Sequence, residues 1–175
     1  MTSWARHEED IEMGRTHSTK SLATETDGGL SEQAVADFVR RFDTAWSSPS
    51  PDALNELVHA DIEFIQPMEA PVHGHREAAA FWRRLLTLVP DLRGEVISWG
   101  FRGQHVYLEF RMFGTLGGKP IEWVVLDRIV LEDGRVRQRV AYFNPMPLVR
   151  AVLARPRSWL PYLAAQYQRL GPGPS

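Results

Sequence analysis

The fold of this chain is decided by the stretch Ile121–Asn144, which reads IEWVVLDRIVLEDGRVRQRVAYFN. In its first half every second residue from Ile121 is bulky and apolar, with Asp127 as the exception, and this period of two is that of a half-buried β-strand. Asp133-Gly134 then provides the residues that a tight turn between antiparallel strands requires. The stretch predicts a β-hairpin, but its second strand has polar and apolar residues on both faces, so periodicity does not indicate which face is buried.

Two more strands precede this hairpin and extend it into a sheet. They cover Glu95–Phe101 and Gln104–Leu116 and are joined by turn residues at Arg102-Gly103, while Gly117-Gly118 leads into the hairpin. Four strands in series with short turns predict an antiparallel meander. In the second strand, alternation predicts an inward face of Val106, Leu108, Phe110 and Met112 and an outward face of Tyr107, Glu109, Arg111 and Phe113.

The residues before the meander have the period of helices. Ser31 is a suitable N-cap for a helix whose apolar face reaches Trp46, and Pro51 can begin a short second helix. A short strand over Asp61–Pro67 and a third helix that ends before Pro90 complete this half. Helices followed by a curved sheet predict an α+β protein in which the sheet packs on the N-terminal helices.

The composition fits one domain with loose ends. Of the 175 residues 43% are apolar, which favours a single globular unit, here residues 30–150. Residues 1–29 are polar and aperiodic, and 171–175 read GPGPS, so both ends are expected to be disordered. A helical extension is expected over 151–170, with helices at Pro147–Ala154 and Ser158–Leu170.

Charge and composition exclude several functions. The net charge of −2 favours neither nucleic acid nor an anionic membrane as a partner, and no apolar run is long enough for a membrane span or a secretory signal. We therefore expect a cytoplasmic protein. The chain has no cysteine, and His73-Gly74-His75 has no third ligand beside it, so neither a metal nor another cofactor is expected.

Asp127 is the first candidate for chemistry, because it is the one carboxyl group in a row of bulky apolar side chains. Burial there would favour the protonated form and raise the pKa of Asp127, which would allow it to donate a proton near neutral pH. The alternative is a structural ion pair with Arg111 or Arg128.

Gln66 ends the first strand, where its amide could orient a carbonyl group or a water. Arg139 is either a surface charge or an anchor for an anion or carboxylate.

The order of these elements resembles the nuclear transport factor two-like superfamily, in particular its SnoaL-like polyketide cyclases, ketosteroid isomerases and limonene-epoxide-hydrolase-type enzymes. The resemblance rests on the helical hairpin, the x-Pro strand end, the turn Pro71–Gly74, Asp133–Val136 and the closing Ala141–Asn144. It implies a cone, in which a bent sheet wraps around helices and an apolar pocket opens at one end.

The resemblance also implies roles for individual residues. Asp127 falls where ketosteroid isomerases keep a protonated aspartic acid in the oxyanion hole. The tyrosine that partners this acid falls at Phe42, and the general-base aspartate falls at Gln66. The arginine and two aspartates of the epoxide hydrolases fall at Phe110, Met112 and Ala141. None of these catalytic sets is complete in this chain.

These features together predict a cyclase-like or isomerase-like enzyme, without a cofactor, that acts by acid–base catalysis on an apolar, carbonyl-bearing substrate. Asp127 and Gln66 would be catalytic, and a homodimer is expected. One alternative is a non-catalytic ligand-binding or dimerisation module, and another is a protein-interaction role for a stripe at Trp159–Leu170. The predicted pocket-lining residues are Phe42, Phe64, Trp82, Trp99, Phe110, Met112, Trp123, Arg139, Tyr142 and Phe143.

Overall fold

The computed structural model describes residues 29–155 and residue 159. The described chain is α+β, with helices and strands in two groups along the sequence. In order, the elements are α1 (Glu32–Ser47), α2 (Pro51–Glu56), β1 (Val58–Ile65), β2 (Val72–His73), α3 (Gly74–Leu88), β3 (Arg93–Arg102), β4 (His105–Leu116), β5 (Lys119–Glu132), β6 (Arg135–Tyr142) and α4 (Met146–Leu153).

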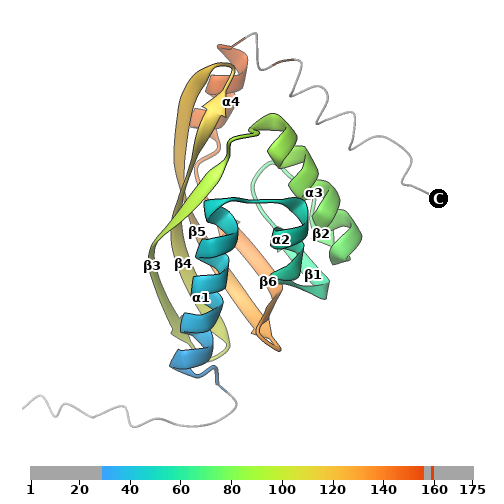
Figure 1. Cartoon of the computed structure of the whole chain (residues 1–175), viewed down its shortest axis with the longest axis vertical. Coiled ribbons are helices and arrows are strands. Elements are labelled where there is room, and N and C mark those ends of the chain that lie inside the picture. The colour runs from blue at the N-terminus through green and yellow to red at the C-terminus, as the bar shows by residue number, and fades with distance from the viewer. Residues whose placement is uncertain (1–28, 156–158, 160–175) are drawn as a thin grey trace, which may run out of the picture.

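The strands of the described chain form one mixed sheet in the order β2-β1-β6-β5-β4-β3. The predicted meander is confirmed, since β3 to β6 pair antiparallel in sequence order. Strand β1 lies parallel to β6, which adds the N-terminal half to the edge of the meander. Figure 1 shows the sheet bent, with α1 lying along the β3–β5 part and α2 and α3 beside β1 and β2.

The start of α1 after the N-cap Ser31 and the start of α2 at Pro51 are as predicted. The side-chain oxygen of Ser31 accepts a hydrogen bond from the Ala34 N–H at 3.2 Å, and Ser50 caps α2 in the same way with Pro51 as its first residue. Each cap satisfies an N–H group that has no partner within the helix. The start of α1 and the break between α1 and α2 are therefore encoded locally.

Two details of the β1 region differ from the prediction. Strand β1 begins at Val58 rather than Asp61, and Val72–His73 form a short strand, β2, where we expected only a turn. Strand β2 is two residues long and pairs with Glu63 and Phe64. A strand of two residues is too short to show alternation in the sequence. It is recognised as a strand only because it pairs with β1.

An aromatic cluster joins the two halves of the core. Phe42 of α1 packs edge-on against Phe110 of β4 with ring centroids 5.1 Å apart, and Trp46 packs edge-on against Trp82 of α3 at 5.9 Å. Phe64 of β1 lies 5.0 Å from the same Trp82 ring. Such pairs add directional packing to the burial of large apolar surfaces. The helices and the sheet therefore enclose one continuous core.

The C-terminal prediction is confirmed in part. The helix expected over Pro147–Ala154 is present as α4, whereas the expected disordered arm, the helix over Ser158–Leu170 and the tail lie outside the described residues, except for Gly29 and Trp159. The indole Nε1 of Trp159 donates a hydrogen bond to the Val152 carbonyl at 3.0 Å. No helix within the described residues is long and apolar enough to cross a membrane.

Candidate functional site

A cavity of about 320 Å³ lies between α3, α4, the inner face of the sheet and the loop that follows β1. This volume is that of a site for a small organic molecule. Most of its lining is apolar and comes from elements that are far apart in the sequence. The lining residues are Trp46, Gln66, Pro67, Met68, Glu69, Phe81, Arg84, Leu85, Leu88, Met112, Trp123, Val125, Arg139, Phe143, Pro145, Leu148, Val149, Val152 and Leu153.

Not all of the predicted site residues line this cavity. Gln66, Met112, Trp123, Arg139 and Phe143 line the cavity. Phe42, Phe64 and Trp82 surround a separate void of about 20 Å³, which Arg139 also lines. Phe110 is fully buried in the aromatic cluster.

Trp99 and Tyr142 are not part of the cavity, contrary to the prediction. Trp99 is 40% exposed, because it lies on β3 at the open edge of the sheet, although its partner Leu108 is buried. Tyr142 is 53% exposed and lies opposite Leu126 on the outer face of the sheet. Alternation indicates the face of a strand, but not how near a residue is to the edge.

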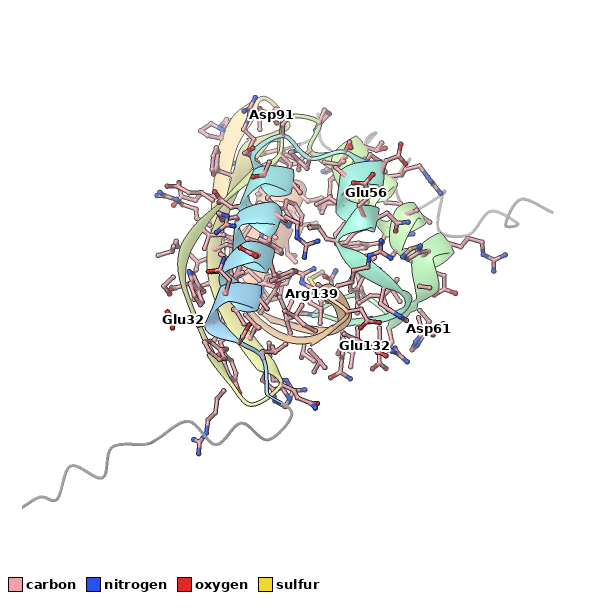
Figure 2. The ribbon with its side chains drawn as sticks, turned by 60° about the horizontal axis from the view of Figure 1, so that its bottom comes forward. Glu32, Glu56, Asp61, Asp91, Glu132 and Arg139 are labelled. Atoms are coloured by element: carbon pink, nitrogen blue, oxygen red, sulfur yellow. The ribbon has the colours of Figure 1, made fainter. Side chains whose placement is uncertain are left out.

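A buried ion pair lies beside the cavity. The Nε of Arg139 donates to Oδ2 of Asp127 at 2.5 Å, and both residues are buried, with Asp127 fully enclosed. Neither proposed structural partner of Asp127 is correct, since Arg111 pairs with Glu95 and Glu122 on the other face of the sheet. The surface-charge interpretation of Arg139 is also wrong. In Figure 2 Arg139 lies in the middle of the molecule, between the helices and the sheet.

A β-bulge explains why the sequence of β6 was ambiguous. Val136 pairs with Leu131, but Gln138 pairs with the neighbouring Val130, so the register shifts at this point. The extra residue, Arg137, reverses the alternation along the strand. Val136 and Arg139 therefore both point inward, although they are an odd number of residues apart.

The environment of Asp127 favours its protonated form. Burial raises the pKa of the Asp127 carboxyl group above its ordinary value, and the ion pair with Arg139 opposes this shift only in part. Oδ1 of Asp127 has no hydrogen-bond partner among the described residues. The predicted direction of the pKa shift is therefore confirmed, although the partner is one that the sequence did not indicate.

Arg139, rather than Asp127, lines the cavity. Asp127 is behind Arg139 and is not among the lining residues, so a direct contact between Asp127 and a ligand has no support in this geometry. The guanidinium carbon of Arg139 lies 5.8 Å from the Phe64 ring and 5.9 Å from the Phe110 ring. These cation–π contacts and the Asp127 bond together fix the orientation of the guanidinium group.

A second charged pair, which the sequence analysis missed, lines the cavity near α3. Arg84 lies 3.7 Å from Glu69, and their side chains are 15% and 22% exposed. The guanidinium of Arg84 also lies over the Phe81 ring at 5.8 Å. Arg84 lies in α3, a helix whose apolar stripe is visible in the sequence, whereas Glu69 lies in a turn that has no periodicity. Only the position of Arg84 therefore had a signal in the sequence.

Within the described residues no group of three or more His, Asp or Glu side chains could hold a metal ion.

The fold and the cavity define the class of the protein as a cone-shaped α+β domain with an apolar pocket. Residues 39–139, more than half of the chain, match the model of the SnoaL-like domain. The chain belongs to the SnoaL-like family, which confirms the resemblance inferred from the sequence.

Solved structures of other proteins share this fold. A SnoaL-like protein of the polyketide-cyclase type from Jannaschia is 22% identical, with 71% of this chain and 94% of that chain covered and a TM-score of 0.61. An LEH-like epoxide hydrolase from M. tuberculosis is 18% identical, with coverages of 70% and 92% and a TM-score of 0.56. A protein with a ketosteroid isomerase-like fold from Catenulispora acidiphila, in complex with trimethylamine, is 19% identical, with coverages of 70% and 96% and a TM-score of 0.59. No functionally curated protein matches the sequence.

Proposed function

We propose that this protein is a cyclase-like or isomerase-like enzyme that acts by cofactor-free acid–base catalysis on an apolar, carbonyl-bearing small molecule. The observation that carries the proposal is the position of Arg139, a buried cation at the wall of a cavity with a mostly apolar lining. The trimethylamine complex of the Catenulispora protein agrees with a small-molecule site in this fold.

Arg139 would stabilise negative charge that develops on the substrate oxygen. When a proton leaves the carbon beside a carbonyl group, the charge moves to the oxygen, where donors in a dry site act most strongly. One such donor is worth roughly 3 to 4 kcal/mol of transition-state stabilisation. Asp127 would be a positioning residue, because its bond to Nε holds the guanidinium group in place.

Glu69 and Gln66 would supply the remaining polar chemistry. Glu69 is the one carboxyl group among the described residues that line the cavity, so it is the candidate base that removes the proton and returns it at another carbon. Gln66 lies on the same lining, and its amide can both donate to and accept from a substrate or a water.

The experiment uses 2-tetralone, a bicyclic ketone that is small enough for the cavity. In D₂O, an enzyme of this type exchanges the protons next to the carbonyl group, and NMR follows the loss of their signals. We expect faster exchange than in buffer, a loss of about 10²-fold or more in Arg139→Met, and a comparable loss in Glu69→Gln. Glu132→Gln, at an exposed position on β5, is the matched control and should exchange like wild type.

A non-catalytic ligand-binding module is the second candidate, and the Glu69–Arg84 pair favours it. The guanidinium group of Arg84 lies 3.7 Å from the Glu69 carboxylate, so the candidate base already has a partner in the protein. Binding of 2-tetralone without any acceleration of exchange would support this candidate and contradict the proposed catalysis.

A further inference from the structure

We propose that the natural ligand is an organic carboxylate, whose carboxylate group binds Arg139 while its apolar body fills the cavity. This inference rests on the proposed small-molecule site but not on its catalytic activity. It places a carboxylate group, instead of a carbonyl oxygen, at Arg139, and so concerns what the site binds rather than the reaction proposed above.

The first argument is the unused hydrogen-bonding capacity of Arg139. A guanidinium group has five N–H donors, and the bond to Asp127 uses the one on Nε. Among the described residues no acceptor is hydrogen-bonded to Nη1 or Nη2 of Arg139. Nη1 and Nη2 are not among the buried side-chain atoms that lack a partner, so they are not fully enclosed. Arg139 also lines the cavity. These donors therefore face space that a ligand can occupy.

The second argument is the balance of charge around the guanidinium group. Arg139 brings a positively charged guanidinium group into the interior. Among the described residues its one ionisable partner is Asp127, which is fully buried, and burial favours the neutral form of that carboxyl group. The Phe64 and Phe110 rings offset part of the cost of burying the cation, but they carry no net charge. An anion bound at the remaining donors would add a counter-charge to a guanidinium group whose own partner is, because of burial, disfavoured in its charged form.

The third argument is the character of the rest of the cavity. Its walls include Trp123, Val125 and Leu148, so they favour an apolar body and exclude water. Glu69 and Arg84 are paired with each other, and their charges cancel to a first approximation. The charged side chain that a ligand meets near β6 is therefore Arg139. A carboxylate accepts two parallel bonds from a guanidinium group, and such charge-assisted bonds are about twice as strong as those to a neutral carbonyl.

The test compares two ligands of the same shape, 2-naphthoate and 2-naphthamide, by isothermal titration calorimetry at fixed ionic strength. We expect wild type to bind the carboxylate about tenfold or more tightly than the amide. The ratio should fall to about one in Arg139→Met, because no cation then faces the cavity near β6. The matched control is Arg111→Met, which removes the same charge from the outer face and should keep the ratio.

The results separate the inference from the proposed function. A ratio near one in wild type, or a ratio that survives in Arg139→Met, overturns the carboxylate site. If Arg139→Met does not fold, Arg139→Lys replaces it: a single ammonium group cannot keep both the Asp127 bond and the two-pronged geometry, so the ratio should fall there as well. Failure of wild type to bind either compound rejects the small-molecule site and this inference together. Preference for 2-naphthoate without exchange of 2-tetralone rejects the catalysis alone.

Discussion

Arg139 and Asp127 are diagonal neighbours on the inner face of the sheet, since Asp127 lies opposite Ala141 and Arg139 lies opposite Ile129. Because of this offset, the long arginine side chain extends towards Ala141 and reaches the Asp127 carboxyl group with a bond of 2.5 Å. The hydrogen bond to Asp127 therefore fixes Arg139 in a position where it lines the cavity, while Asp127 itself does not.

The pH dependence of stability should report on Asp127. Because its pKa is raised in the folded state, the folded protein holds the proton more tightly than the unfolded chain does. This contribution is fully present below the ordinary value of 3.8 and is lost as the pH rises through the folded pKa. The variant Asp127→Asn resembles the protonated form and does not titrate. Its free energy of unfolding, relative to wild type, should therefore improve as the pH rises above 3.8.

Urea titrations from about pH 4 to about pH 7 measure this difference. Asp61→Asn is the matched control, because it makes the same chemical change at a side chain that is 75% exposed. A difference between wild type and Asp127→Asn that stays constant over this range would show that burial does not shift the pKa as described.

Gly114 should not tolerate a methyl group. A Cβ atom built on Gly114 would lie 2.6 Å from Cγ1 of Val89 and 3.3 Å from Cα of Leu92, and the second atom belongs to the backbone. We expect Gly114→Ala to lower the free energy of unfolding by about 1 to 3 kcal/mol. Gly100→Ala is the control, because a Cβ atom at that position would have nothing within 4 Å. Equal stability of the two variants in urea denaturation would contradict the close packing at Gly114.

Arg155 should hold α4 over the cavity. Its guanidinium donates to the carbonyl groups of Leu116 at 3.0 Å and Lys119 at 3.2 Å, both at the turn between β4 and β5. No residue of α4 is fully buried, so this anchor is important for its position. Removal of these bonds in Arg155→Met should speed amide hydrogen exchange in α4 by about tenfold or more. Arg150→Met, at an exposed position of α4, should leave the exchange rate unchanged, and an equal effect of both variants would refute the anchor.

The outer face of the sheet should form the predicted homodimer. Leu126 and Tyr142 are directly opposite on neighbouring strands and are 46% and 53% exposed, and Val124 beside them is 45% exposed. A contiguous exposed apolar surface of this kind is typical of an interface, and a symmetric dimer is the commonest assembly. Light scattering after size exclusion should give a dimer for wild type and a shift to monomer for Leu126→Glu. Thr44→Glu on α1 should remain dimeric, whereas a monomeric wild type would reject the prediction.

Local patterns were sufficient for the longer helices and strands and for one face of the sheet. The caps at Ser31 and Ser50 and the turn glycines act within a few residues, so their structure follows from neighbouring sequence. The alternation in β5 correctly indicated that Asp127 points into the core, because side chains in a regular strand point to opposite faces in turn.

Only the tertiary structure decided the partner of Asp127 and the composition of the cavity. The bulge at Arg137 depends on how β6 pairs with β5, and it turns Arg139 inward against the simple alternation of the strand. The parallel pairing of β1 with β6 places Phe64 opposite Arg139, although many residues separate them in the sequence. The cavity is lined by residues of α3, α4, the sheet and the loop after β1, so Glu69 faces it for a reason that no local pattern contains. Propensity and periodicity describe a residue and its near neighbours, whereas this site consists of contacts between segments that only the complete fold brings together.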